Sequence, residues 1–170
     1  MKLHQFPISH YCEKVRWTLD YKGLKYQPVN YLPGRHLKPV KQLSGQTAVP
    51  VLTSAGQVIS GSADIITFLD QSCPDRPLTP ADTELRQQAL DWEARLDNEA
   101  GPAVRLWVYH HLLSRPDLLV PMLAAGQPFW VGWLLRMKYA EVEKGMRRWM
   151  NVNDETAAAA QKTMETLLEE

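Results

Sequence analysis

A proline-rich segment, residues 73–80, separates two parts of this chain that have different sequence patterns. The segment contains three of the chain's twelve prolines, and proline ends regular elements because its ring fixes φ and removes a backbone donor. Before the segment, short apolar runs alternate with helical patterns; after it, only helical patterns occur. The sequence therefore predicts two domains, residues 1–74 with strands and helices and residues 80–170 with helices alone.

The order of elements expected in the first domain is β-α-β-α-β-β-α. Strands are predicted at residues 3–6, 26–31, 49–52 and 58–59, and helices after Ser9, at residues 36–43 and after Ser62. Ser9 and Ser62 are each interpreted as the N-cap of the helix that follows. Pro28 favours an edge position for the second strand, because it cannot donate to a ladder. These elements predict an α/β layer on a small mixed sheet.

Helical patterns in the second domain cover residues 84–98, 104–113 and 139–149, with a last helix after Asp154 as its N-cap. Gly101-Pro102 is expected to kink or interrupt the first of them before residues 104–113. Residues 118–135 are strongly apolar but are broken by Pro121, Gly126, Gln127, Pro128 and Gly132. The last pattern runs to Glu170 without a C-cap signal, so the helical domain is expected to be incomplete.

Residues 118–135 are apolar enough to raise the question of a membrane, but their prolines and glycines argue against a spanning helix. Basic residues follow this segment and would allow contact with a membrane surface. The interior of a helical domain or a dimer face is the more common reason for such a segment and is the favoured interpretation.

The composition is that of a globular protein and disfavours several classes of function. Hydrophobic residues make up 45% of the chain, and the 19 basic residues equal the 19 acidic ones, which argues against a nucleic-acid partner. Two cysteines, Cys12 and Cys73, cannot form a disulfide framework, and no Cys/His spacing suggests a metal site. A reducing cytoplasm is the expected compartment, and the N-terminus lacks the apolar segment of a signal peptide.

Ser9-His10-Tyr11-Cys12 lies where a strand is followed at once by a helix N-terminus. Such a turn is a site for an anion, because helix N–H groups and the positive end of the helix dipole meet there. A thiol at this position can have a lowered pKa, and the Ser9 hydroxyl could stabilise a thiolate further. The simpler interpretation, in which Ser9 only caps the helix and Cys12 is a small buried residue, stays open.

Two further motifs could bind a ligand. Pro50 opens a strand and cannot donate to a ladder, which leaves the neighbouring backbone free to bind something else. The helix N-terminus at Gly61-Ser62 can bind a carboxylate. Each motif is weak alone, since Val-Pro is common and plain capping explains Ser62.

Taken in order, the Ser-x-x-Cys helix, the Val-Pro hairpin and the Ser-x-x-Ile helix resemble the N-terminal domain of glutathione S-transferases over residues 2–72. The helical remainder resembles the second domain of that superfamily more loosely. The resemblance implies a thioredoxin-like fold in which Pro50 is cis and faces the N-terminus of the helix that Ser9 opens. It also implies a cytoplasmic homodimer that takes part in detoxification.

By this resemblance, Ser9 is the catalytic residue and hydrogen-bonds the glutathione sulfur, since no tyrosine lies on the first strand. Val49 and Pro50 would hold the cysteinyl backbone, Ser62 the γ-glutamyl carboxylate, and His36 or Lys38 the glycyl carboxylate. Gly61 departs from the family, in which many members have Glu or Gln at this position. The implied glutathione-binding residues are Ser9, Tyr11, His36, Lys38, Val49, Pro50, Gly61 and Ser62.

The expected function is activation of the glutathione thiol for attack on a hydrophobic electrophile or a peroxide, with glutathione as co-substrate and no metal. Two alternatives stay open. A non-catalytic adaptor of the same fold is favoured by Gly61, and a glutathione-dependent reductase would use Cys12 as its redox group. Aromatic residues at 107 and 109–111 could line the second substrate's pocket, although ordinary helix packing explains such residues more often.

Overall fold

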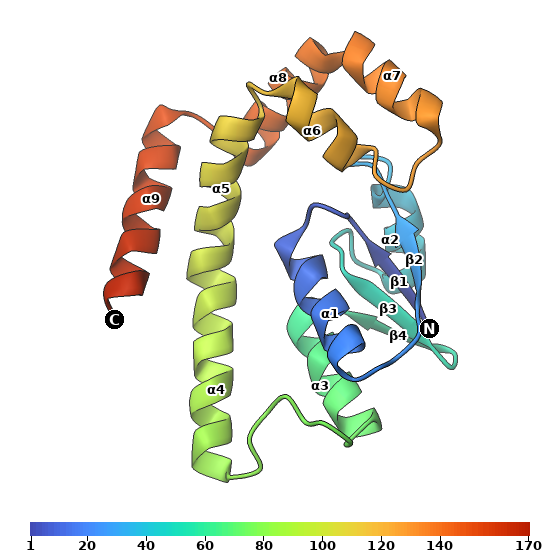
Figure 1. The fold of residues 1–170 in the computed structure, drawn as a ribbon, viewed down its shortest axis with the longest axis vertical. Coiled ribbons are helices and arrows are strands. Elements are labelled where there is room, and N and C mark those ends of the chain that lie inside the picture. Colours follow the sequence, from blue (N-terminus) through green and yellow to red (C-terminus); the bar gives the residue numbers. More distant parts are fainter. The chain divides into compact units, whose positions relative to one another are not determined.

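The computed structural model describes all of residues 1–170, which form two compact units, Met1–Asp91 and Trp92–Glu170. Every strand lies in the first unit, and the second is entirely helical (Figure 1). This confirms the predicted fold class. The two units divide within a helix, whereas the sequence pattern changes at the proline-rich segment; the assignment of domains to residues 1–74 and 80–170 stays a prediction.

The first unit has the predicted order of elements. These are β1 (Lys2–Gln5), α1 (His10–Tyr21), β2 (Gln27–Asn30), α2 (Leu37–Ser44), β3 (Val51–Ser54), β4 (Gln57–Ser60) and α3 (Ser62–Ser72). The strands form one mixed sheet in the order β2-β1-β3-β4, in which only β1 and β2 are parallel. α1 makes the crossover that a parallel pair requires, and β2 lies at the edge, as Pro28 predicts.

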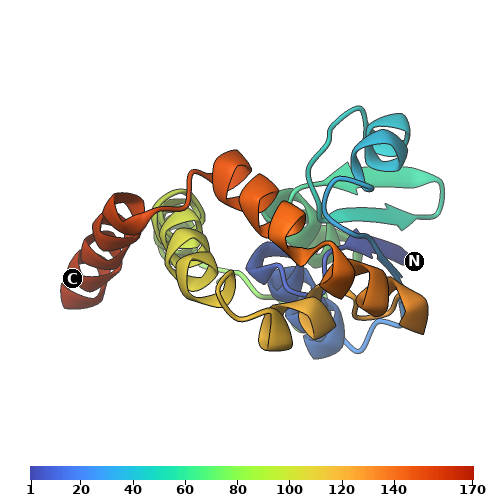
Figure 2. The same cartoon turned by 90° about the horizontal axis from the view of Figure 1, so that it is seen from above.

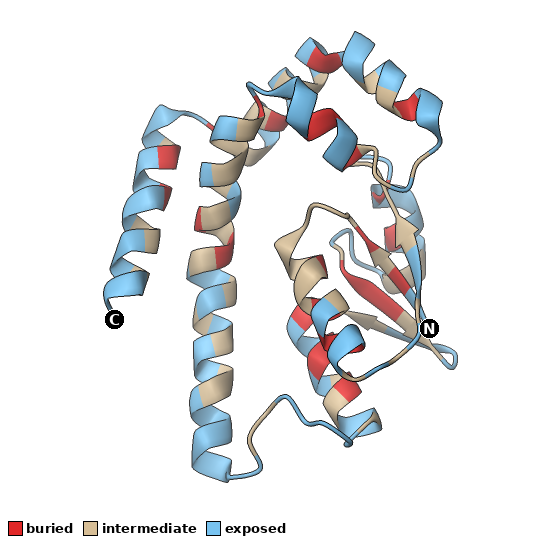
Figure 3. Ribbon diagram, in the orientation of Figure 1, coloured by how far each residue is buried: buried red, intermediate tan, exposed pale blue.

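The core of the first unit lies between the sheet and two helices. Leu3 of β1 and Leu52 of β3 are directly paired in the sheet and are fully buried. They belong to one cluster with Val15, Leu19, Ile65 and Leu69, which come from α1 and α3 at helical spacing. α1 and α3 therefore pack side by side against one face of the sheet (Figures 1 and 3).

A buried ion pair holds the proline-rich segment against the helices of the first unit. The Lys22 ammonium lies 2.7 Å from an Asp70 carboxylate oxygen and also donates to the carbonyls of Cys73 and Arg76. The Asp70 carboxylate accepts from Leu78 N–H and from the N–H and hydroxyl of Thr79. The segment is thus fixed to the ends of α1 and α3 although it has no regular structure.

The remaining elements are α4 (Thr83–Arg95), the π-helical turn η1 (Leu96–Ala100), α5 (Gly101–Leu112), α6 (Pro116–Leu123), α7 (Phe129–Met137), α8 (Tyr139–Met150) and α9 (Asp154–Glu169). The chain does not break at Gly101-Pro102 but widens into η1 before it, because Pro102 lacks an N–H and its ring crowds the preceding turn. The predicted cap of the last helix was wrong by one residue: Asn153 is the N-cap and forms a reciprocal capping box with Thr156.

Within the second unit, α5 and α9 run side by side in both views (Figures 1 and 2). Small residues of both helices are buried, among them Ala103, Ala157 and Ala160. The Tyr139 hydroxyl donates to the Leu113 carbonyl at 2.9 Å and so joins the start of α8 to the end of α5. None of the helices is both long and apolar enough to cross a membrane.

Candidate functional site

Ser9 lies at the turn between β1 and α1 and is the N-cap of α1, as predicted. Its hydroxyl oxygen accepts a hydrogen bond from Cys12 N–H at 3.4 Å, and its carbonyl accepts from Glu13 N–H at 2.9 Å. Because the oxygen accepts from the backbone, the hydroxyl hydrogen can donate to another group. The Ser9 hydroxyl thus lies where the positive end of the α1 dipole favours an anion.

The Val49–Pro50 peptide bond is cis, as the resemblance implies. Val49 precedes β3 and takes no part in the ladder, and no backbone hydrogen bond within the chain involves its N–H or C=O. The Pro50 carbonyl, in contrast, accepts from Gly61 N–H at 3.0 Å. Val49 therefore presents both backbone groups of one residue to a ligand with an extended backbone.

The start of α3 differs from the prediction in its cap. Gly61 is the N-cap, with φ 94° and ψ 144°, and Ser62 is the first helical residue rather than the cap. Ser62 as a residue is 6% exposed, but its hydroxyl oxygen is not among the buried atoms that lack a partner. The first backbone N–H groups of a helix have no partner within it, so this helix N-terminus with its hydroxyl is a candidate to bind a carboxylate.

The register of the sheet brings these three motifs to one end of it. β1 and β3 are antiparallel with His4 opposite Val51, so the end of β1, which leads to Ser9, lies beside the start of β3, where Val49 is. β3 and β4 are antiparallel with Val51 opposite Ser60, so the end of β4 brings Gly61 to the same end. Residues from three separate parts of the sequence thus form one candidate site.

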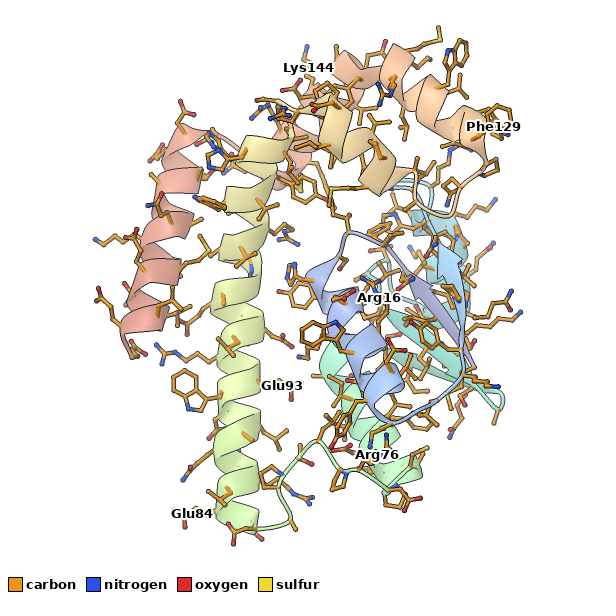
Figure 4. All side chains as sticks on the ribbon, in the orientation of Figure 1. Arg16, Arg76, Glu84, Glu93, Phe129 and Lys144 are labelled. Atoms are coloured by element: carbon orange, nitrogen blue, oxygen red, sulfur yellow. The ribbon has the colours of Figure 1, made fainter.

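A polar network that the sequence analysis missed holds the Ser9 turn in place. The Arg16 guanidinium donates to Gln5 Oε1 at 2.6 Å, to the Pro7 carbonyl at 2.9 Å and to the Glu13 carboxylate (Figure 4). Gln5 in turn donates to Asn30 Oδ1 at 2.9 Å. The available signal was Gln5 itself, a polar residue on the same side of β1 as Leu3.

Cys12 differs from the expectation of a lowered pKa. Its side chain is 0% exposed and lies on the buried side of α1 with Val15 and Leu19. Burial raises the pKa of the Cys12 thiol, and this effect outweighs the opposing hydrogen bond from Ser9. The geometry therefore corresponds to the simpler interpretation of Cys12 as a small buried residue.

His36 is a buried structural residue rather than a group open to a carboxylate. Its Nδ1 accepts from Gly34 N–H at 3.1 Å, and its ring packs edge-on against Phe6. Burial lowers the pKa of His36, although hydrogen bonds with the backbone of Leu32 and Thr47 oppose the shift. Lys38 is exposed on α2, and Tyr11 is half-buried on the first turn of α1 with its ring against His10.

The aromatic residues of α5 are occupied by contacts within the second unit. The Trp107 and His111 rings pack edge-on at 4.6 Å, and His110 Nε2 lies 2.9 Å from an Asp154 carboxylate oxygen at the start of α9. These contacts explain Trp107, His110 and His111 as helix packing. No group of three or more His, Cys, Asp or Glu residues is placed to hold a metal ion.

Comparison with known proteins gives a family for the first unit. The family described as "Glutathione S-transferase, N-terminal domain" matches residues 3–77. Glutathione S-transferase 1 of Dianthus caryophyllus is 37% identical over 97 residues, which cover 55% of this chain and 43% of that protein. A zeta-class glutathione S-transferase of Euphorbia esula is 29% identical over 151 residues, covering 85% and 63%. Maleylpyruvate isomerase of Ralstonia sp is 36% identical over 91 residues, covering 52% and 43%.

Solved structures with the same fold cover nearly all of the chain. A β-etherase from Sphingobium sp. strain SYK-6 has a TM-score of 0.67 at 22% identity, over 95% of this chain and 68% of that one. A glutathione S-transferase from Methylobacterium radiotolerans, solved in complex with glutathione sulfonate, has a TM-score of 0.55 at 24% identity, over 94% and 76%. The chain spans about half the length of the curated relatives it matches. The first unit therefore belongs to the glutathione S-transferase N-terminal domain family over residues 3–77, and the chain as a whole is similar to members of the glutathione S-transferase superfamily.

Proposed function

We propose that this chain provides the glutathione site of a transferase-type enzyme and that Ser9 holds the glutathione sulfur as a thiolate. The observation that carries the proposal is the position of the Ser9 hydroxyl at the α1 N-terminus, where its oxygen accepts from Cys12 N–H. A hydroxyl fixed in this way donates to a neighbouring anion, and a donated hydrogen bond favours the charged form of the thiol. The helix dipole acts in the same direction.

The other two motifs orient the peptide. The unpaired N–H and C=O of Val49 bind the cysteinyl backbone as an added strand would, and the Ser62 hydroxyl with the α3 N-terminus binds the γ-glutamyl carboxylate. The exposed Lys38 is the remaining candidate for the glycyl carboxylate, because His36 is buried. Orientation of the sulfur and loss of its proton are the two contributions to rate that these residues supply.

In the reaction, the thiol loses its proton to solvent and the thiolate sulfur forms a bond to an electrophilic carbon of a hydrophobic co-substrate. Where the co-substrate has a leaving group, that group departs with the bonding electron pair. Where it has no leaving group, the product takes up a proton. A peroxide is the second co-substrate class. The relatives named as glutathione S-transferases support this reaction type. We further propose a homodimer in the cytoplasm with a role in detoxification, as the resemblance implies.

Two other functions compete with this proposal. A reductase that uses Cys12 would need an accessible thiolate, whereas the Cys12 thiol is buried and its pKa is raised. A non-catalytic adaptor is favoured by Gly61, which offers no side chain to the γ-glutamyl group. Retention of the chain on immobilised glutathione separates the enzyme from the adaptor.

The decisive experiment compares Ser9→Ala and Ser9→Thr with the control Ser54→Ala at the end of β3. The thiolate absorbance of bound glutathione is followed against pH, and conjugation is measured with a chlorodinitrobenzene. Ser9→Ala is expected to raise the pKa of the bound thiol and to slow conjugation by about tenfold for each unit of pKa. Ser9→Thr and Ser54→Ala should keep most of the rate. An unchanged rate in Ser9→Ala, with glutathione still bound, would remove Ser9 from catalysis.

A further inference from the structure

One face of α7 is apolar and exposed. Phe129, Trp133 and Met137 follow one another at a spacing of four residues, and their exposed fractions are 93%, 61% and 65%. Trp130 and Leu134 extend the same face and are also exposed. On a helix these five positions cover an arc of about 140°. In Figure 4 the labelled Phe129 side chain points outward from the start of α7.

The opposite side of α7 is the side that packs within the second unit. Val131 is buried, and α7 lies against α6, whose Leu119, Val120 and Leu123 are buried as well. A Cβ added at Gly132 would meet the Ala124 Cβ at 3.7 Å, so the two helices approach closely there. The expectation that residues 118–135 form the interior of a helical domain therefore fits the buried residues of α6 and α7. It does not explain the five exposed residues on the other face of α7.

The indole groups on this face have no partner for their N–H. Neither Trp130 nor Trp133 makes a hydrogen bond within the chain, whereas the exposed Trp17 of the first unit donates to Glu13 at 2.8 Å. An aromatic ring that is apolar on its faces and can donate at one edge is typical of the interface between lipid tails and headgroups. The face thus matches a boundary between an apolar and a polar phase.

Positive charge accompanies this face. Residues 118–140 contain no Asp or Glu, while Arg136 and Lys138 lie exposed at the end of α7. Over residues 129–150 there are five basic residues and two acidic ones, although the whole chain has a formal net charge of zero. Lys144 and Arg148 of α8 are also exposed. A partner for this surface should therefore be both apolar and anionic.

We propose that α7 docks on a lipid membrane that carries anionic headgroups. Phe129, Trp133 and Met137 enter the interfacial layer, and the long side chains of Arg136 and Lys138 reach the headgroup phosphates. The contact is peripheral, because α7 has nine residues and lies along the surface. It depends on the second unit and goes beyond the proposed glutathione chemistry of the first.

A second copy of this chain suits the surface less well. A two-fold contact brings the same patch of both copies together, so Arg136 and Lys138 of one would approach those of the other. Like charges that lose water in such a contact repel. Anionic lipid satisfies the aromatic residues and the basic residues at the same time.

The test is flotation of the whole chain with two kinds of vesicle, phosphatidylcholine alone and phosphatidylcholine with one third phosphatidylglycerol. We expect the chain to float with the anionic vesicles, to float much less with the neutral ones, and to be released by high salt. Brominated lipids should quench tryptophan emission of the bound chain. Absence of flotation with the anionic vesicles would overturn the proposal, as would equal binding to both kinds.

Variants locate the contact on α7. Phe129→Ser with Trp133→Ser is expected to weaken binding to anionic vesicles by about tenfold or more, because each removes a large apolar side chain from the interface. Trp17→Ser, which removes an equally exposed tryptophan from the first unit, should leave binding unchanged. Arg136→Gln with Lys138→Gln should weaken binding at low salt, whereas Lys162→Gln on α9 should not.

Circular dichroism and glutathione retention of each variant separate loss of the fold or of the glutathione site from loss of lipid binding. If the aromatic variant floats as the unchanged chain does, the α7 assignment is wrong. The other outcome is that the unchanged chain does not float but forms a concentration-dependent dimer, and that the aromatic variant does not form this dimer. The surface then belongs to a second copy of the chain, and the membrane proposal fails.

Discussion

Gly61 N–H donates to the Pro50 carbonyl at 3.0 Å, and this single bond connects the cis proline to the loop that begins α3. Gly61 has φ 94°, a backbone conformation that residues other than glycine rarely adopt. Residue 61 therefore links two parts of the candidate site, and its backbone conformation favours glycine. Many members of the superfamily nevertheless have Glu or Gln there, by the resemblance noted above.

Gly61→Gln is expected to lower the free energy of unfolding by about 1–2 kcal/mol, because a Cβ is strained at positive φ. An added Cβ meets only Asp64, at 3.9 Å, so crowding adds little. The amide should at the same time raise the affinity for glutathione by contacting the γ-glutamyl group. Denaturant unfolding and calorimetric titration measure the two effects.

The matched control is Gly56→Gln in the β3–β4 turn, where φ is 83° and a Cβ has open space. It also places a Cβ at positive φ, which is strained, and it should bring no gain in affinity. Equal glutathione affinities for the two variants would show that residue 61 does not face the γ-glutamyl group.

Cys12→Ala should keep the conjugation rate within about twofold and lower stability by about 1–2 kcal/mol, since the thiol is a buried packing group. Cys73→Ala, which changes the other and partly exposed cysteine, should affect neither property. Rates at saturating glutathione and urea unfolding give the two values. A folded Cys12→Ala variant without activity would restore the reductase interpretation.

Arg16→Met should lower the free energy of unfolding by about 2–3 kcal/mol, because the buried Gln5 oxygen and the Pro7 carbonyl lose their donor. Since the Pro7 carbonyl belongs to the turn that carries Ser9, glutathione binding should weaken as well. Arg35→Met is the control for loss of one positive charge, because Arg35 is exposed and lies two residues before α2. The hypothesis fails if both variants unfold at the same urea concentration.

Asp70→Asn should cost about 3 kcal/mol at pH 7, because the fully buried Lys22 side chain loses its carboxylate partner. Burial alone would raise the pKa of Asp70, but hydrogen bonds from Lys22, Leu78 and Thr79 outweigh it and lower the pKa. The pKa of Asp70 is therefore lower in the folded chain than in the unfolded chain, where it is about 3.9. The ionised carboxylate stabilises the fold above the unfolded-state pKa, and this stability is lost as the pH falls through the folded-state pKa.

The stability difference between the unchanged chain and Asp70→Asn should therefore be constant from neutral pH down to about pH 5 and shrink below pH 4. Asp20→Asn, which changes an exposed carboxylate on α1, is the control and should cost little stability at pH 7. Urea unfolding at a series of pH values measures both. A difference that grows on acidification would contradict the assigned direction.

Local patterns predicted the elements well where a pattern and its boundary signal agreed. Ser9 as N-cap, Pro28 on an edge strand and the broken helices after residue 118 all follow from rules that act within a few residues. Where two adjacent residues both favour the N-cap position, the sequence is ambiguous: Asn153 and Asp154 are both good caps, as are Gly61 and Ser62. The assignment then depends on backbone angles that the sequence does not contain.

Residues whose partners are distant in the sequence could not be predicted. Gln5 meets Asn30 through the pairing of β1 with β2 and accepts from Arg16 of α1, and the ring of the buried His36 packs against Phe6. Cys12 illustrates the same limit, since a helix N-terminus lowers a thiol pKa only when the thiol stays accessible, and α1 turns this one inward.

The sequence by itself determined the order of elements and the positions of the three candidate motifs, because capping, proline geometry and apolar periodicity are local properties. The order of those motifs carried the resemblance to glutathione S-transferases. Only the tertiary structure decided which groups those motifs leave available. The antiparallel register brings Ser9, Val49 and Ser62 to one end of the sheet, and packing on a single side of α7 leaves its aromatic residues exposed. Both outcomes depend on which faces meet in space, and that is set by the sum of many distant contacts.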